Sequence, residues 1–142
     1  MNKIEADQVI KEVKAALNKM TEYSENAQSV SFLSYYNNAP DFLHISSDGN
    51  MRNYEEFSRI CSEYYTALES QEIFTVSENL NIIDTGLVIS GWTGNITARF
   101  KNGDTMIMNN YSVSNLFKKI NGEWKIIHSH ESALPPEFIK KS

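Results

Sequence analysis

The chain has 142 residues, of which 41% are hydrophobic, 22% charged and 11% aromatic. This composition excludes disordered, collagen-like and low-complexity chains, and the length suffices for one domain with a single hydrophobic core. The formal net charge is -5, from 13 Lys and Arg against 18 Asp and Glu. Because nucleic acids and anionic membranes bind clustered cations, we expect no nucleic-acid partner and no membrane partner.

The N-terminus has no features of a secretory signal. Glu5 and Asp7 lie within the first turns, and no apolar core follows them. No apolar run approaches the roughly 20 residues of a membrane span. We therefore expect a cytoplasmic protein. The single cysteine, Cys61, excludes an intramolecular disulfide and a cysteine-rich zinc site, and we expect its thiol to be buried and inert.

The first half of the chain has a helical pattern. Residues 4–23 carry one apolar stripe at helical spacing, made of Val9, Val13, Ala16, Leu17 and Met20. A shorter helix is predicted over residues 26–36 and a short strand over residues 41–46. A third helix begins after Asn53, which is suited to capping it together with Glu56. Its apolar stripe consists of Phe57, Ile60, Cys61, Tyr64 and Leu68.

From residue 71 the apolar pattern changes to period two. Four long strands are predicted, over residues 72–83, 87–100, 105–120 and 123–132. Asn121-Gly122 separates the last two, and this pair favours a tight hairpin because both residues accept positive φ. Helices followed by a strand meander predict an α+β fold with the helices on one face of a mostly antiparallel sheet. Long strands curl, so we expect a concavity between sheet and helices that binds a ligand.

The last strand carries two of the three histidines of the chain. Strict alternation places one set of its side chains on the pocket face, namely Trp124, Ile126, His128 and His130. The two histidines are then an acid/base pair, polar pocket groups, ligands of a metal, or ordinary packed histidines. A zinc site needs a third protein ligand, and only His44 remains. A site of all three histidines stays an alternative, and we predict no metal and no cofactor.

Other polar residues are candidates for the pocket. Asp41 and Asp48 are either proton-transfer bases or turn formers, and Arg99 is either an anion clamp or a solvated residue. An inward-facing asparagine in the long strands either hydrogen-bonds a ligand or satisfies its neighbours. The predicted ligand-binding residues are Tyr36, His44, Phe57, Tyr64, Trp92, Tyr111, Asn115, His128 and His130.

The stretch from Tyr111 to Ser132 resembles the closing hairpin of SnoaL-like domains in the nuclear transport factor 2-like superfamily. The matching residues are Gly122, Trp124, Lys125, Ile126, His128, His130 and Ser132. Residues 41–49 and 54–57 resemble the first strand and the helix entry of the same domains. The closing histidines also resemble the association domain of calcium/calmodulin-dependent protein kinase.

The resemblance implies a conical α+β barrel over residues 1–142, with three N-terminal helices on a strongly curved sheet and a homodimer formed through the outer sheet face. It places His128 and His130 towards the pocket, and Lys125, Ile127 and Ser129 near the dimer surface. The ketosteroid isomerases of this fold have an aspartate where this chain has Ser46, which argues against their mechanism.

The function expected from this resemblance is binding of a small, partly apolar molecule. One alternative is a cofactor-free acid/base enzyme of isomerase, dehydratase or polyketide-cyclase type, with His130, His128 and His44 as catalytic candidates. The other alternative is a non-catalytic oligomerisation module.

Overall fold

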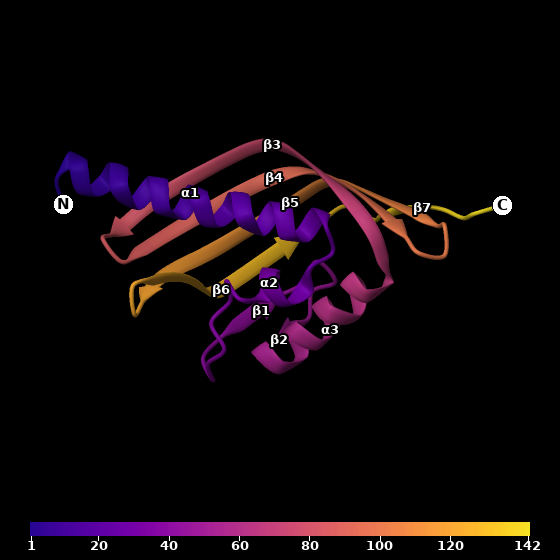
Figure 1. Ribbon diagram of the computed structural model, residues 1–142, viewed down its shortest axis with the longest axis horizontal. Coiled ribbons are helices and arrows are strands. Elements are labelled where there is room, and N and C mark those ends of the chain that lie inside the picture. The colour runs from indigo at the N-terminus through magenta and orange to yellow at the C-terminus, as the bar shows by residue number, and fades with distance from the viewer.

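The computed structural model describes residues 1–142. Its helices all pack on one side of a curved sheet (Figure 1). Helix α1 (Lys3–Glu25) begins at a complete capping box between Asn2 and Glu5, and its apolar stripe is buried as predicted at Val9, Val13, Ala16 and Met20. Helix α2 (Ser29–Leu33) is shorter than predicted at both ends: Ala27 adopts a positive φ of 54° before it, and Tyr36 after it forms a β-bridge with Ile126. Helix α3 (Tyr54–Ala67) is capped by the side chain of Asn53, which accepts a hydrogen bond from the backbone N–H of Glu56; the Glu56 side chain makes no return bond.

The sheet has seven strands. Their bounds are β1 (Leu43–Ile45), β2 (Met51–Arg52), β3 (Leu68–Asp84), β4 (Leu87–Phe100), β5 (Thr105–Ile120), β6 (Glu123–Ser132) and β7 (Glu137–Ile139). The order is β2-β1-β6-β5-β4-β3, with β7 paired to the start of β5, and only the β1–β6 pair is parallel. Strands β4, β5 and β6 have the predicted bounds, and the predicted α+β class is confirmed.

A β-bulge in β6 changes which side chains face the helices. Phe117 of β5 pairs with Ile126, whereas its neighbour Leu116 pairs with His128, so Ile127 is an extra residue. Trp124 and Ile126 face inward and are buried, as alternation predicts. Beyond the bulge the alternation is shifted by one residue. The prediction that the inward face continues through His128 and His130 is therefore wrong, and Ser129 and Glu131 face inward instead.

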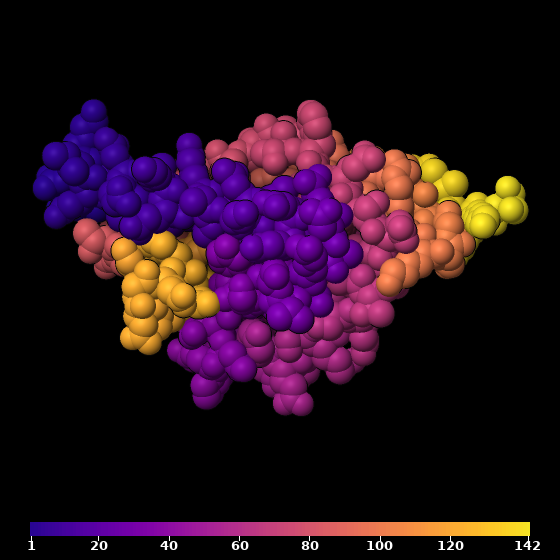
Figure 2. All heavy atoms as spheres, in the orientation of Figure 1, coloured from indigo at the N-terminus to yellow at the C-terminus, as the bar shows by residue number.

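The main hydrophobic core lies between α1 and the β4–β5–β6 part of the sheet. Val88, Phe117 and Ile126 are fully buried there against the stripe of α1. The indole of Trp124 donates a 2.7 Å hydrogen bond from Nε1 to Oε2 of Glu12, which fixes α1 to the closing hairpin. Figure 2 shows α1 covering the sheet at this end, while the C-terminal residues project at the other end. No helix has both the length and the apolar character needed to cross a membrane.

Gly94 in β4 lies beneath the indole of Trp92. A Cβ atom at Gly94 would lie 2.2 Å from the carbonyl oxygen of Phe74 and 2.5 Å from the Trp92 ring. At Gly91, three residues earlier in the same strand, a Cβ atom would meet nothing within 4 Å. The backbone carbonyl cannot move away without disturbing the β3–β4 pairing.

We expect Gly94→Ala to lower the free energy of unfolding by about 1–3 kcal/mol, because it overpacks the strand against backbone and indole. Gly91→Ala is the matched control, and it is expected to leave the stability unchanged or slightly raised. Urea unfolding followed by tryptophan fluorescence measures both variants. Equal effects of the two substitutions would contradict this account of Gly94.

Candidate functional site

A cavity of about 430 Å³ lies between the helices and the concave face of the sheet. Its wall is mostly apolar, since 16 of the 27 lining residues are hydrophobic. Seven of the nine predicted ligand-binding residues line it, namely Tyr36, His44, Phe57, Tyr64, Trp92, Tyr111 and Asn115. Its size and character match those of small-molecule sites in other proteins.

Three polar side chains from three strands meet in this cavity. Glu131 of β6 accepts a short hydrogen bond at Oε2 from the hydroxyl of Tyr111 in β5. Nε2 of His44 in β1 lies 3.7 Å from the same carboxylate oxygen. The imidazole of His44 packs on the ring of Phe57 at a centroid distance of 4.3 Å. A carboxylate, a phenol and an imidazole thus share one point of a mostly apolar wall, an arrangement suited to moving a proton.

Burial shifts the pKa values of all three groups. It raises the pKa of Glu131 above its usual value, and the hydrogen bond from Tyr111 partly opposes this rise. It lowers the pKa of His44 to about 4, aided by the positive charge of Arg52, so the imidazole is neutral at pH 7. It also raises the pKa of Tyr111, which keeps its proton. The site therefore combines a carboxyl of increased basicity with two neutral donors.

The β1–β2 turn forms one edge of the cavity. Arg52 pairs with the Asp48 carboxylate at 3.0 Å and donates a 2.5 Å hydrogen bond to Oγ of Ser46. Asp48 also accepts a hydrogen bond from the backbone of Asn50. The guanidinium of Arg52 holds the pKa of the Asp48 carboxyl below its usual range. Asp48 is therefore a turn former and an ion-pair partner, and it is a poor base.

A second set of polar side chains lines the cavity, namely those of Ser24, Tyr64, Tyr65 and Gln71. The amide of Gln71 donates to Oγ of Ser24 at 2.7 Å and to its carbonyl at 3.1 Å. The hydroxyl of Tyr65 donates to the same Oγ, and the hydroxyl of Tyr64 donates to Oε1 of Gln71. These bonds join α1, α3 and β3 where all three line the cavity. They hold the wall in shape and leave the Glu131 cluster as the chemically reactive part.

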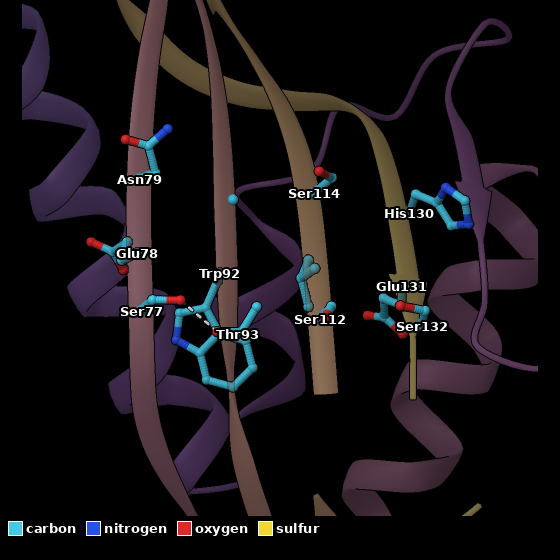
Figure 3. Close-up of a pocket in the computed structure, with 12 residues that line it drawn as sticks. Ser77, Glu78, Asn79, Trp92, Thr93, Ser112, Ser114, His130, Glu131 and Ser132 are labelled. Carbon is cyan, nitrogen blue, oxygen red and sulfur yellow. Dashed lines mark hydrogen bonds between the residues drawn. The ribbon is translucent and has the colours of Figure 1, made fainter. Parts of the chain in front are cut away.

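The outer face of the sheet has a second hollow of about 420 Å³, and His130 lies there. This hollow shares Trp92 and Glu131 with the inner cavity. Figure 3 shows two rows of side chains across β3 to β6: Ser77, Thr93, Ser112 and Ser132 in one, and Asn79, Ser114 and His130 in the other. His128 pairs with Leu116 and faces the same side as His130. Ser129, expected near an outer dimer surface, is instead fully buried inside.

The remaining predicted candidates lie away from the reactive cluster. Asp41 is exposed in the turn before β1. Arg99 is exposed and pairs with Glu72 at 3.1 Å on the outer face. Cys61 lines the cavity, and burial raises the pKa of its thiol to about 12, which makes it unreactive. No group of three or more His, Cys, Asp or Glu side chains is placed to hold a metal ion.

Glu131 is the residue that sequence reasoning missed. Alternation counted from Trp124 assigns it to the outer face, because simple counting includes no bulge. One signal in the sequence points to the bulge: polar and apolar residues alternate from Glu123 to Ile126, and the second isoleucine, Ile127, breaks this alternation. The pairing of β6 with β5 determines that Glu131 faces inward, and this pairing depends on contacts between segments distant in the sequence.

Comparisons with known proteins agree with this architecture. Residues 13–136 match the SnoaL-like domain family. Among solved structures, a candidate scytalone dehydratase from Novosphingobium aromaticivorans superposes with a TM-score of 0.84 at 6% identity, covering 99% of this chain and 94% of that one. A type 2 hexachlorocyclohexane dehydrochlorinase superposes with a TM-score of 0.78 at 7% identity, covering 98% and 94%.

A nuclear transport factor 2-like superfamily protein from Salmonella enterica superposes with a TM-score of 0.78 at 16% identity, covering 92% of this chain and 94% of that one. These identities are low, so the superpositions show a shared fold alone. No functionally curated protein matches the chain in sequence. The family match extends over most of the chain and agrees with the closing hairpin, the helix order and the cavity between helices and sheet. The chain belongs to the SnoaL-like domain family, within the nuclear transport factor 2-like fold.

Proposed function

We propose that this domain binds a small, partly apolar molecule in the cavity and removes a proton from one of its carbon atoms, with Glu131 as the base. The observation that carries the proposal is the Glu131 carboxyl, held in a mostly apolar wall in contact with Tyr111 and close to His44. The sequence indicated acid/base chemistry only as an alternative, and with histidine as the base.

The chemistry follows from the protonation states. The raised pKa of Glu131 makes its carboxylate a stronger proton acceptor than an exposed one. When a carbon–hydrogen bond next to a carbonyl breaks, the proton moves to Glu131 and the electron pair moves to the carbonyl oxygen. Neutral His44, with a proton on Nε2, is suited to donate to that oxygen. Loss of a leaving group from the resulting enolate gives an elimination, and return of the proton to another carbon gives an isomerisation.

The structural relatives support the elimination class. Two of them are described as a candidate scytalone dehydratase and a hexachlorocyclohexane dehydrochlorinase, and both names denote removal of a small molecule from a carbon skeleton. The same fold at low identity hosts unrelated functions, so the Glu131 cluster remains the main support. Plain ligand binding without turnover is the outcome that the following experiment separates from catalysis.

We expect the protein to accelerate the ring opening of 5-nitrobenzisoxazole, a general probe for a carboxylate base in an apolar site. The carboxylate takes the C–H proton of the isoxazole ring, the electron pair of that bond completes the carbon–nitrogen triple bond of a nitrile, and the nitrogen–oxygen bond breaks to give a coloured phenolate. Glu131→Gln is expected to lower the rate about 100-fold or more, because it removes the base. Absorbance measures the rate, and quenching of the tryptophan fluorescence measures binding of the probe, because Trp92 lines the cavity.

Glu78→Gln is the matched control. Glu78 lies on the same row of the sheet as Glu131 and also lines the cavity, but its side chain is exposed at the edge strand β3. We expect its rate to stay within about twofold of that of the wild type. If the probe binds without acceleration, the domain is a binding protein; if both variants lose the same activity, Glu131 is not the base.

The raised pKa of Glu131 also predicts a pH dependence of stability. The folded protein binds this proton more tightly than the unfolded chain, in which the pKa of the glutamate is near 4.5. The wild type therefore loses stability as the pH rises from that value through the pKa of the folded protein. Glu131→Gln removes this loss. Its free energy of unfolding, relative to the wild type, should rise with pH over that window and then level off.

His44 acts in the opposite direction. Because its pKa is lower in the folded protein, the free energy of unfolding rises with pH between about pH 4 and 6.5. The difference between wild type and Glu131→Gln largely cancels this contribution, since both proteins contain His44. Urea unfolding at pH values from about 4 to 8 provides the measurement. A difference that stays constant over the whole range would mean that the Glu131 carboxyl titrates normally.

We also propose a homodimer through the outer face of the sheet. Phe74 and Val76 of β3 are 67% and 63% exposed, and Ile89 of β4 is 40% exposed. Such apolar side chains on a sheet face support contact with a second copy.

Sedimentation equilibrium should give twice the chain mass for the wild type. Phe74→Asp should give a monomer, because it places a charge in the contact. A monomeric wild type would contradict the proposed dimer, and so would a Phe74→Asp variant that remains dimeric.

A further inference from the structure

A row of buried polar side chains crosses three neighbouring strands beside the Glu131 cluster. In the sheet register His44 of β1 lies opposite Ser129 of β6, and Ser129 lies opposite Asn115 of β5. Directly opposed residues project to the same face with Cβ atoms about 5 Å apart. The three side chains therefore stand side by side on the inner face, and His44 and Asn115 line the cavity.

All three residues are almost completely removed from solvent. Their exposed fractions are 2% for His44, 0% for Ser129 and 6% for Asn115. Each nevertheless has a buried polar atom without a hydrogen-bond partner in the protein: Nδ1 of His44, Oγ of Ser129 and Oδ1 of Asn115. Buried polar atoms are nearly always paired because an unpaired one costs free energy. Three such atoms in one row indicate a site for a polar group from outside the chain.

The chemistry of the three atoms defines that group. A neutral imidazole has one N–H, and the carboxylate near Nε2 favours placing the hydrogen there, which leaves Nδ1 as an acceptor. Oδ1 of Asn115 is an acceptor too. Ser129 can donate one hydrogen or accept one. The row is therefore rich in acceptors and requires a donor, and a neutral donor is favoured because burying a charge is costly.

We infer that the cavity wall at His44 and Asn115, with Ser129 between them in the sheet, is a subsite for a hydroxyl group, filled by water in the free protein and by a hydroxyl of the ligand in the complex. The inference rests on the proposed function, because it names a feature of the molecule that enters the same cavity. A hydroxyl here donates to Nδ1 or Oδ1 and accepts from Ser129. It also keeps the hydrogen of His44 on Nε2, towards Glu131.

Phenol and toluene test the subsite, because they have nearly the same shape and differ in the hydroxyl. Isothermal titration should show tighter binding of phenol to the wild type. Ser129→Ala should weaken phenol binding about tenfold and leave toluene binding unchanged. This variant removes a hydroxyl that has no hydrogen-bond partner within the protein, so folding should not suffer. Asn115→Leu, which keeps the size of the side chain, should also reduce the preference for phenol.

Ser114→Ala is the matched control, since Ser114 is the neighbouring β5 residue on the outer face, and it should bind both probes as the wild type does. Loss of the phenol preference in Glu131→Gln, with its retention in Ser129→Ala, would place the hydroxyl at Glu131 and overturn the subsite. The ring-opening assay tests Glu131 as a base, so its failure would overturn the reaction and leave the phenol comparison interpretable.

Crystal structures of the free protein and of the phenol complex distinguish water from the ligand hydroxyl. We expect a water within hydrogen-bond distance of Oγ of Ser129 in the first, and the phenol oxygen in its place in the second. A water retained there, with phenol bound elsewhere, would overturn the ligand subsite. Two-bond 1H–15N spectra should show the Nε2–H form of His44 in the wild type, and a mixture of the two tautomers in Ser129→Ala.

Discussion

The extra residue Ile127 in β6 determines which chemistry this cavity holds. Side chains of a strand alternate between faces, so one additional residue exchanges the faces for everything that follows it. Before the bulge, β6 contributes Trp124 and Ile126 to the hydrophobic core. After it, β6 contributes Ser129 and Glu131 to the inner face, while His128 and His130 lie outside. One strand thus supplies both core packing and a reactive carboxyl.

Burial then determines how these groups behave. A carboxyl in an apolar wall loses hydration, so its charged form is disfavoured and its pKa rises; the same loss lowers the pKa of an imidazole. Glu131 and His44 therefore move towards neutral forms together, although an exposed pair of this kind would be oppositely charged. The hydroxyl of Tyr111 compensates part of the desolvation of Glu131. The net effect is a pKa of Glu131 that stays above its usual value.

The two faces of the sheet are built differently. The inner face has large apolar and aromatic side chains around a few polar ones, which favours enclosure of an apolar molecule. The outer face across β3 to β6 has short hydroxyl side chains beside the exposed Phe74 and Val76. Because one set of strands forms both faces, the register that defines the cavity also defines the outer surface. The bulge that moves Glu131 inward is the same one that moves His130 outward.

The sequence by itself determined the α+β class, the three helices and the bounds of β4, β5 and β6, because helical spacing, alternation and the Asn121-Gly122 turn are local properties. It also indicated most of the cavity wall, since Tyr36, Tyr64 and Tyr111 are amphipathic residues of elements that enclose a concavity. Only the tertiary structure decided the β1–β6 pairing, the short strands β2 and β7, and the inward position of Glu131. Strand pairing and bulges depend on hydrogen bonds between segments far apart in the chain, and alternation along one strand contains no information about them.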